Sequence, residues 1–395
     1  MVLLLGYAYW RGIRSSRKIE KAFEDSIGFR AICPRRTPDH VTISRFRKDN
    51  RMELGGLFEH ILKEAQAQGM IDPGTASLDG TKVKANAALS ANATDEILDR
   101  QLAKIAEEEA AEKADNADPA LSGLARAAKK RGRRSRIERR TKAKAKLEKK
   151  KAARLAGEAQ KQEERLRKQE ETGKKARGRK PKKLSAEELS EGKVNTTDPE
   201  SEIMKTKHGY LQGYNAQIVV TMQQIILAAD VTTQQNDMHQ LTPMIERTQE
   251  SLGALGIDTS TFTTLLADTG YCSAANLAAL DGEAVVVLTP PKKDKKVDET
   301  IKTFKGRESE SPLASEPLTT IPGMAHYLST PEGRERYKKR GSTVEPTFGQ
   351  IKENEGIRSF MCRGLEACRS EWRMICAMHN LRKIKAHRDR LKKAA

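Results

Sequence analysis

The chain has 395 residues, of which 37% are hydrophobic and 32% are charged, and it carries a formal net charge of +19. Its five cysteines are odd in number and contain no C-x-x-C pair, which argues against a disulfide framework and against a zinc ribbon. The length predicts two or three structural units with a buried core, and the charge predicts a polyanionic partner.

Residues 1–72 are predicted to form an N-terminal helical domain. The apolar run VLLLGYAYW is too short to span a bilayer, and apolar residues then recur at helical spacing from Ile19 to Ile27. The segment TPDHVTISRFRK predicts a turn and a cap before a basic helix that carries Arg45 and Arg47. Short basic helices fit a helix-turn-helix unit that enters a DNA groove, and an ordinary packed bundle is the other interpretation.

The segment ASLDGTKVK predicts a strand that contains Asp79, within a first core segment of residues 75–93. Asp-Gly between short extended runs is also a common hairpin turn, so Asp79 alone does not establish a catalytic residue.

Residues 94–195 are predicted to form a basic helical insertion. They are rich in Ala, Glu, Lys, Arg and Gln, and DNADP at residues 115–119 predicts a break between two helices. Residues 126–183 hold 27 Lys or Arg and 7 Asp or Glu, a net charge of +20 (27 − 7). A solvated charged helix is the usual interpretation of such a run, but this density favours contacts with DNA phosphates.

Within this segment, ARGRKPKK resembles a short hook that enters A·T-rich minor grooves, which makes Arg177 and Arg179 candidate DNA contacts. Deleting residues 126–183 is expected to flatten the salt dependence of DNA binding.

After residue 195 the pattern is typical of an α/β domain, and we assign residues 196–385 to it, followed by a basic tail at residues 386–395. GYNAQIVVT and IILAADVT predict paired strands, and Asn236-Asp237 predicts the cap of the next helix. Buried strands follow at residues 262–267, ending at Asp268, and at residues 284–288. Residues 292–331 are rich in Pro, Ser and Glu and predict a mobile loop.

The segment RYKKRGSTVEPTFGQIK gathers Tyr337, Arg340, Glu345 and Lys352. Ser342 three residues before Glu345 is a capping-box pattern, so we predict that a helix begins here and that Glu345 and Lys352 share one face. The other interpretation is a capping glutamate beside solvated cations.

Three carboxylates then stand out by position, Asp79, Asp268 and Glu345. Each of the two aspartates has a turn or cap as an alternative interpretation. Strand ends meet at one edge of an α/β sheet, so the three groups could meet although they are far apart in sequence. Carboxylate oxygens are ligands that Mg²⁺ prefers, and two ions would support phosphodiester cleavage.

Four motifs carry a resemblance, in this order: SLDGTKVKANA, GYNAQIVV, LLADTGYCS and RYKKRGSTVEPTFGQIK. Together they resemble the DDE transposases of bacterial insertion sequences, in the group with a Tyr-Arg-Glu-Lys signature. The spacing Y-x2-R-x4-E-x6-K is met by Tyr337, Arg340, Glu345 and Lys352. The resemblance covers nearly the whole chain.

This resemblance implies an RNase H-like core, a mixed five-stranded sheet flanked by helices, in which Asp79, Asp268 and Glu345 hold two Mg²⁺ ions that Mn²⁺ could replace. It implies cleavage of DNA at the terminal inverted repeats of a transposon and joining of the freed 3′-hydroxyl to target DNA. Arg340 and Lys352 would contact phosphates, and Tyr337 would contact the DNA strand. A homodimer on DNA in the bacterial cytoplasm, at the nucleoid, without a membrane, is also implied.

Two departures leave alternatives open. The insertion interrupts the core between its first and second strands, whereas some relatives insert after the fifth. The chain also begins inside what resembles the N-terminal helical domain of the family. One alternative is therefore a truncated or domesticated DNA-binding protein without catalysis, and another is a structural basic protein that binds RNA or the ribosome.

Overall fold

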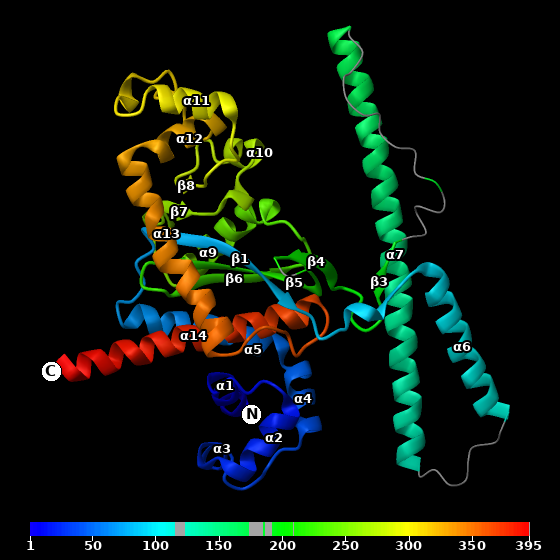
Figure 1. Ribbon diagram of the computed structural model, residues 1–395. Helices are drawn as coiled ribbons and strands as arrows, with labels where there is room; N and C mark the ends of the chain where they lie inside the picture. Colours follow the sequence, from blue (N-terminus) through cyan, green and yellow to red (C-terminus); the bar gives the residue numbers. More distant parts are fainter. Residues whose placement is uncertain (115–122, 174–184, 186–191, 208, 395) are drawn as a thin grey trace. The chain divides into compact units, whose positions relative to one another are not determined.

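The structure is a computed structural model that describes residues 1–114, 123–173, 185, 192–207 and 209–394. The chain divides into two compact units, which Figure 1 shows in the colours of the sequence. We call residues 1–84 and 214–395 the core unit, and residues 85–213 the insertion unit.

The core unit contains a mixed sheet in the order β6-β5-β1-β7-β8. Strand β1 (Thr75–Lys84) is parallel to β7 (Thr264–Leu266), and β7 is parallel to β8 (Val286–Leu288). Strand β6 (Ile226–Thr232) is antiparallel to β5 (Gly209–Thr221), which begins in the insertion unit and continues here. This sheet confirms the predicted mixed α/β class with an RNase H-like core.

Helices cover the sheet and explain why its strands are so apolar. Helices α9 (Leu241–Ala254) and α14 (Leu365–Ala394) both pack on β6, whose first six residues are all buried. Because successive side chains of a strand point to opposite faces, both faces of β6 are covered. Trp372 of α14 is fully buried, and its indole N–H donates a hydrogen bond of 3.1 Å to the Gln217 carbonyl.

The N-terminal residues are helical, as predicted. A buried ion pair ties them to the C-terminal part of the core unit, because Arg14 lies 3.1 Å from Glu371. The same carboxylate accepts hydrogen bonds from the backbone N–H groups of Met361 and Cys362. Helix α14 lies alongside the last of the N-terminal helices, α5 (Figure 1). The five helices are α1 (Val2–Trp10), α2 (Ser16–Asp25), α3 (Ile27–Ile32), α4 (His40–Asp49) and α5 (Arg51–Ala67).

The prediction of a mobile loop at residues 292–331 is wrong, because much of this segment is helical. The segment predicted as a mobile loop forms α11 (Lys295–Thr303) and α12 (Ile321–Ser329), because Asp294 and Thr320 accept hydrogen bonds from the first backbone N–H groups of these helices. Between the strands β7 and β8 a short helix, α10 (Ala274–Ala278), is also present.

The helix that carries the Tyr-Arg-Glu-Lys signature begins earlier than predicted. Helix α13 (Pro331–Gly349) is capped by Thr330, whose hydroxyl accepts a hydrogen bond from the Gly333 N–H at 3.1 Å. Ser342 lies inside this helix and donates to the Lys339 carbonyl instead of capping. The helix continues into one π-helical turn, η6 (Gln350–Asn354).

The insertion unit is built on a helical hairpin of α6 (Asp95–Ala114) and α7 (Gly123–Thr172). Two helices were predicted here, and the predicted break at residues 115–119 lies outside the described residues. A small apolar cluster joins Leu98 of α6, Ala143 and Leu147 of α7, and Val194. The remaining elements are η1 (Leu89–Ala91), the pair β2 (Asn92–Ala93) and β3 (Val194–Asn195), and β4 (Glu202–Thr206), which pairs with the start of β5.

In the part of the chain that the structure describes, no helix is both long enough and apolar enough to span a membrane.

Candidate active site

The register of two parallel strands places the first two predicted carboxylates at the same edge of the sheet. Ser77 of β1 pairs with Leu266 of β7, and Asp79 and Asp268 each follow two residues later. Asp79 lies within the regular strand, so the hairpin-turn interpretation of Asp-Gly is wrong. The two carboxylates are close enough that the charge of Asp268 contributes to raising the pKa of Asp79.

Asp79 is a half-buried carboxylate with one strong cationic partner. Its Oδ1 accepts a hydrogen bond from the Gly80 N–H at 2.8 Å, and its Oδ2 lies 2.9 Å from the Arg340 guanidinium. Burial raises the pKa of Asp79 from 3.8 to about 6, although Arg340 acts in the opposite direction. The surroundings of Asp79 therefore stabilise its charged form only in part. A bound cation would stabilise the charged form further.

Asp268 begins a short 3₁₀ turn, η4 (Thr269–Tyr271), directly after β7. Its Oδ1 accepts a hydrogen bond of 2.8 Å from the Gly270 N–H. The interpretation of Asp268 as a cap is therefore correct, and it does not exclude a second role, because the other carboxylate oxygen is not used in this bond.

Helix α13 brings the other signature residues to the same edge. Tyr337 donates a hydrogen bond of 3.1 Å to the carbonyl of Ala267, the residue before Asp268. Arg340 pairs with Asp79 and also lies 3.7 Å from Glu345, whose side chain is 65% exposed.

Lys352, in the π-helical turn after α13, donates a hydrogen bond to the hydroxyl of Thr81 on β1. Burial lowers the pKa of Lys352, and the charge of Asp79 acts in the opposite direction. The signature segment is thus fixed to the edge of the sheet, to the residue after β7 through Tyr337 and to β1 through Arg340 and Lys352.

The residues at this edge fit a hard divalent cation by their chemistry, although their arrangement is not that of a formed metal site. Within the described residues, no three His, Cys, Asp or Glu side chains are grouped closely enough to hold a metal ion. The Arg340 guanidinium lies between Asp79 and Glu345 and supplies positive charge there. The donors that converge are carboxylate oxygens, which are the ligands that Mg²⁺ prefers.

A fourth carboxylate, Asp237, belongs to this site and was predicted only as a helix cap. It begins a 3₁₀ turn, η2 (Met238–Gln240), but its side chain makes no capping hydrogen bond there. Its Oδ1 instead accepts hydrogen bonds from Asn215 at 2.6 Å and Gln217 at 2.8 Å, and lies 3.5 Å from the Lys82 ammonium.

Asp237 lies between the segments that carry the two predicted aspartates. A Cβ atom at Gly80, next to Asp79, would lie 2.6 Å from Asp237 Oδ1, and one at Gly270, two residues after Asp268, would lie 3.7 Å from its Oδ2. The available signal was the spacing of Asn215 and Gln217, which places both on one face of β5. The sequence shows this spacing, but it does not show which carboxylate the two amide side chains face.

The two remaining described DNA-contact candidates lie on α4. Arg45 is exposed. Arg47 donates a hydrogen bond of 2.8 Å to the Arg14 carbonyl and lies 5.6 Å from the centre of the Tyr9 ring. Packing thus holds Arg47 against the protein. Arg177 and Arg179 lie outside the described residues.

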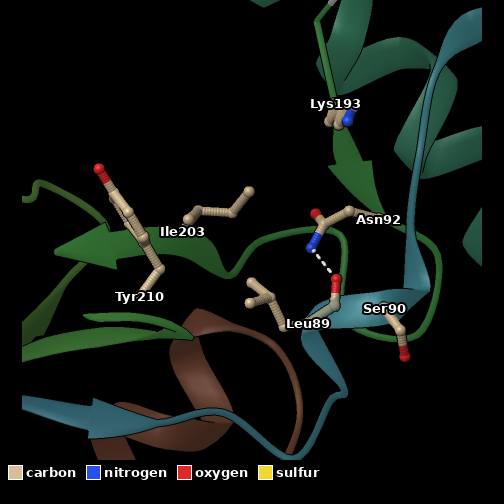
Figure 2. A pocket seen from close by; sticks show the side chains of 6 residues that line it. All are labelled: Leu89, Ser90, Asn92, Lys193, Ile203 and Tyr210. Carbon is tan, nitrogen blue, oxygen red and sulfur yellow. Dashed lines mark hydrogen bonds between the residues drawn. The ribbon is translucent and has the colours of Figure 1, made fainter. Parts of the chain in front are cut away.

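A wide depression of about 510 Å³ in the insertion unit differs from this site in its chemistry (Figure 2). Its lining includes Leu89, Ile203, Tyr210 and one cation, Lys193. Asn92 points at the backbone, and its amide donates to the Leu89 carbonyl at 2.7 Å. No carboxylate lines the described part of this depression, so it offers no ligands for a metal ion.

Comparisons with known proteins assign two parts of the chain to transposase families. Residues 190–381 match the family described as "Transposase DDE domain", and residues 1–49 match the family described as "Transposase domain (DUF772)". The first match includes Asp237, Asp268 and Glu345 but not Asp79. Searches of curated proteins and of solved structures found no match.

Proposed function

Because this chain is a DDE transposase of the insertion-sequence type, with family matches on both sides of its insertion, we propose that it cuts transposon ends and joins the freed 3′-hydroxyl to target DNA. The observation that carries this proposal is the β1–β7 register, which brings Asp79 and Asp268 to one edge of the sheet beneath α13. We assign the catalytic roles to Asp79, Asp268 and Glu345.

These three carboxylates would hold two Mg²⁺ ions, which Mn²⁺ could replace. When bound, such ions activate the attacking oxygen and stabilise the leaving oxygen of a phosphodiester. The protein contributes the rigid placement of Asp79 and Asp268 on paired strands, and a partly buried setting in which electrostatic interactions are stronger than in water.

Arg340 is assigned a role that depends on the state of the site. In the protein without DNA its guanidinium neutralises Asp79 and lies near Glu345. With these carboxylates neutralised by bound metal, Arg340 would be free to contact a phosphate of the DNA. Guanidinium groups suit that contact because their planar donors match two phosphate oxygens.

Lys352 and Tyr337 complete the contacts with the DNA strand. Lys352, in the π-helical turn after α13, donates to the hydroxyl of Thr81, two residues from Asp79, and we assign its ammonium to a second phosphate. The hydroxyl of Tyr337 is used in a hydrogen bond to Ala267, so we assign its DNA contact to the ring.

Asp237 is a positioning residue in this proposal. Its hydrogen bonds to Asn215 and Gln217 hold it against the backbone of Gly80, beside Asp79. The negative charge of Asp237 also stabilises the charged form of Lys82, which burial disfavours. Groups that orient metal ligands in this way commonly change metal affinity or activity about 10- to 100-fold when they are replaced.

The test is cleavage of labelled transposon-end DNA with Mg²⁺, comparing the wild-type chain with Glu345→Gln. Nicking by the wild type and not by the variant, with equal DNA binding, supports the proposal. DNA binding without nicking by the wild type would contradict it and support the alternative, a DNA-binding protein without catalysis.

A further inference from the structure

The two faces of α7 differ in how their charges are used. One face carries Ala143 and Leu147 into the small apolar core of the insertion unit. The cations beside this apolar stripe are paired with carboxylates of the same unit. These ion pairs are Arg136–Glu108, Lys144–Asp99, Lys151–Asp95, and both Lys146 and Lys150 with Glu202.

The opposite face of α7 carries four exposed cations, together with Glu138 and Glu148, which form ion pairs with Lys142 and Lys151. Lys130, Arg131, Arg134 and Lys149 are exposed, and none of them forms an ion pair with another described residue. At about 100° per residue these four positions fall within roughly one third of the helix circumference, opposite Ala143 and Leu147.

The charge also divides along the length of α7. Residues 127–151 contain 14 Lys or Arg and 2 Asp or Glu, a net charge of +12 (14 − 2), whereas residues 152–172 contain five of each. The second part is therefore neutral, although it belongs to the same helix. A general need for solubility does not explain why the uncompensated charge is confined to the first part.

We propose that the exposed face of α7 from Lys130 to Lys149 binds the phosphate backbone of duplex DNA without reading its sequence. This face, which we call the cationic face, is about 29 Å long at 1.5 Å per residue, close to one turn of a DNA duplex. The proposal rests on the proposed DNA substrate but not on the catalytic chemistry. The proposed DNA contact lies in the basic part of the insertion, which neither family match covers.

The pairing on the other face restricts where DNA can bind. Carboxylates of α6 and Glu202 neutralise the cations that border the apolar core, so phosphates there would have to displace existing ion pairs. On the cationic face no ion pair of the four cations is lost. Each phosphate that a cation neutralises there releases condensed counterions, which makes binding strongly dependent on salt.

The test compares two variants with the same loss of charge from the same helix. The first replaces the four cations of the cationic face: Lys130→Gln, Arg131→Gln, Arg134→Gln and Lys149→Gln. The matched control replaces four cations of the neutral part: Lys161→Gln, Arg165→Gln, Arg167→Gln and Lys168→Gln. Glutamine is a good helix former, and circular dichroism checks that helix content is unchanged.

Affinity for a labelled 30-base-pair duplex of arbitrary sequence is measured in EDTA at several salt concentrations, so that catalysis plays no part. For four lost phosphate contacts, the slope of log affinity against log salt should become less steep by about 3.6 in the first variant. The control should keep the wild-type slope. A third variant that exchanges Lys and Arg at the four positions of the cationic face should also keep it.

Three results would overturn the proposal. Equal flattening in both variants would mean that net charge alone governs binding, and an unchanged slope in the first variant would mean that the cationic face does not touch the duplex. Stronger competition by duplex RNA than by duplex DNA of the same length would show that RNA is the partner.

Discussion

Arg340 shows at the scale of one residue how the site is held without DNA. It lies 2.9 Å from Asp79 and 3.7 Å from Glu345, so one guanidinium separates two of the proposed catalytic carboxylates. Without such a cation, the negative charges of Asp79 and Glu345 would repel each other. In this arrangement Arg340 neutralises the carboxylates, and a bound metal cation would take over that role.

Burial of Asp79 is costly for folding, and removing its charge should stabilise the protein. Its folded pKa of about 6 lies above the ordinary value of 3.8, so the folded state holds the proton more tightly and the cost appears as the pH rises from about 4 to about 6. Asp79→Asn should therefore raise the free energy of unfolding at pH 7 by about 1–3 kcal/mol and abolish cleavage. Urea unfolding at pH 7 measures this gain.

The same measurement at pH 4 should show almost no gain, because Asp79 is then protonated in the wild type. A suitable control is Asp230→Asn, because Asp230 lies 3.1 Å from Arg247 and 3.0 Å from Arg369. This substitution removes two ion pairs and should destabilise the protein. A loss of stability in Asp79→Asn at pH 7 would contradict the conclusion that the charged form of Asp79 is costly in the folded state.

Asp237→Asn tests the positioning role. The Asn side-chain oxygen can still accept the hydrogen bonds of Asn215 and Gln217, but no negative charge would offset Lys82. Cleavage should fall about 10- to 100-fold, and the Mg²⁺ concentration for half-maximal cleavage should rise, while DNA binding in EDTA stays unchanged. Loss of DNA binding together with cleavage, at an unchanged Mg²⁺ requirement, would indicate a general structural defect instead.

At the scale of elements, β1 lies close against the Asp237 hydrogen-bond network. A Cβ atom at Gly80 would come within 2.2 Å of Gln217 Nε2 and 2.6 Å of Asp237 Oδ1. Gly80→Ala should therefore displace this network, lower the free energy of unfolding by about 1–3 kcal/mol, and reduce cleavage. Thermal unfolding and the nicking assay measure the two effects.

Gly341→Ala in α13 is the matched control for this substitution. No atom lies within 4 Å of its Cβ position, and alanine favours a helix over glycine. This variant should gain about 0.5–1 kcal/mol and keep activity. If Gly80→Ala were as stable and as active as Gly341→Ala, the close packing of β1 on Asp237 would not matter for function.

The elements were predictable from sequence where burial dominates and not where local signals compete. The continuous apolar runs of β5, β6 and β7 predict buried strands, and the structure contains them. The start of α13 was predicted from the Ser342–Glu345 capping pattern, but Thr330 with Pro331 is a stronger start twelve residues earlier. Helix α12 begins in the same way, from Thr320, inside a segment whose composition suggested a loop.

At the scale of the whole molecule, the order of the motifs predicted the family and the fold, but not the contacts between side chains. Asp79 and Asp268 could be paired through general rules for parallel strands. The contact of Arg340 with Asp79 joins residues 261 positions apart and depends on where α13 lies over the sheet. Asp237 was missed for the same reason, since its partners come from two other strands.

Cation binding should be visible in the stability of the whole protein. If the carboxylate site accepts Mg²⁺ only when folded, Mg²⁺ at ten times its dissociation constant should raise the free energy of unfolding by about 1.4 kcal/mol. Glu345→Gln should reduce this gain, and Asp79→Asn should remove it. An equal gain in both variants would place the binding elsewhere.

The most direct test of the three-carboxylate site is anomalous diffraction from crystals of the protein soaked with Mn²⁺. We expect Mn²⁺ bound by Asp79, Asp268 and Glu345, with the Arg340 guanidinium moved away from Asp79. Mn²⁺ bound only at other residues, with the Arg340–Asp79 ion pair intact, would contradict this expectation.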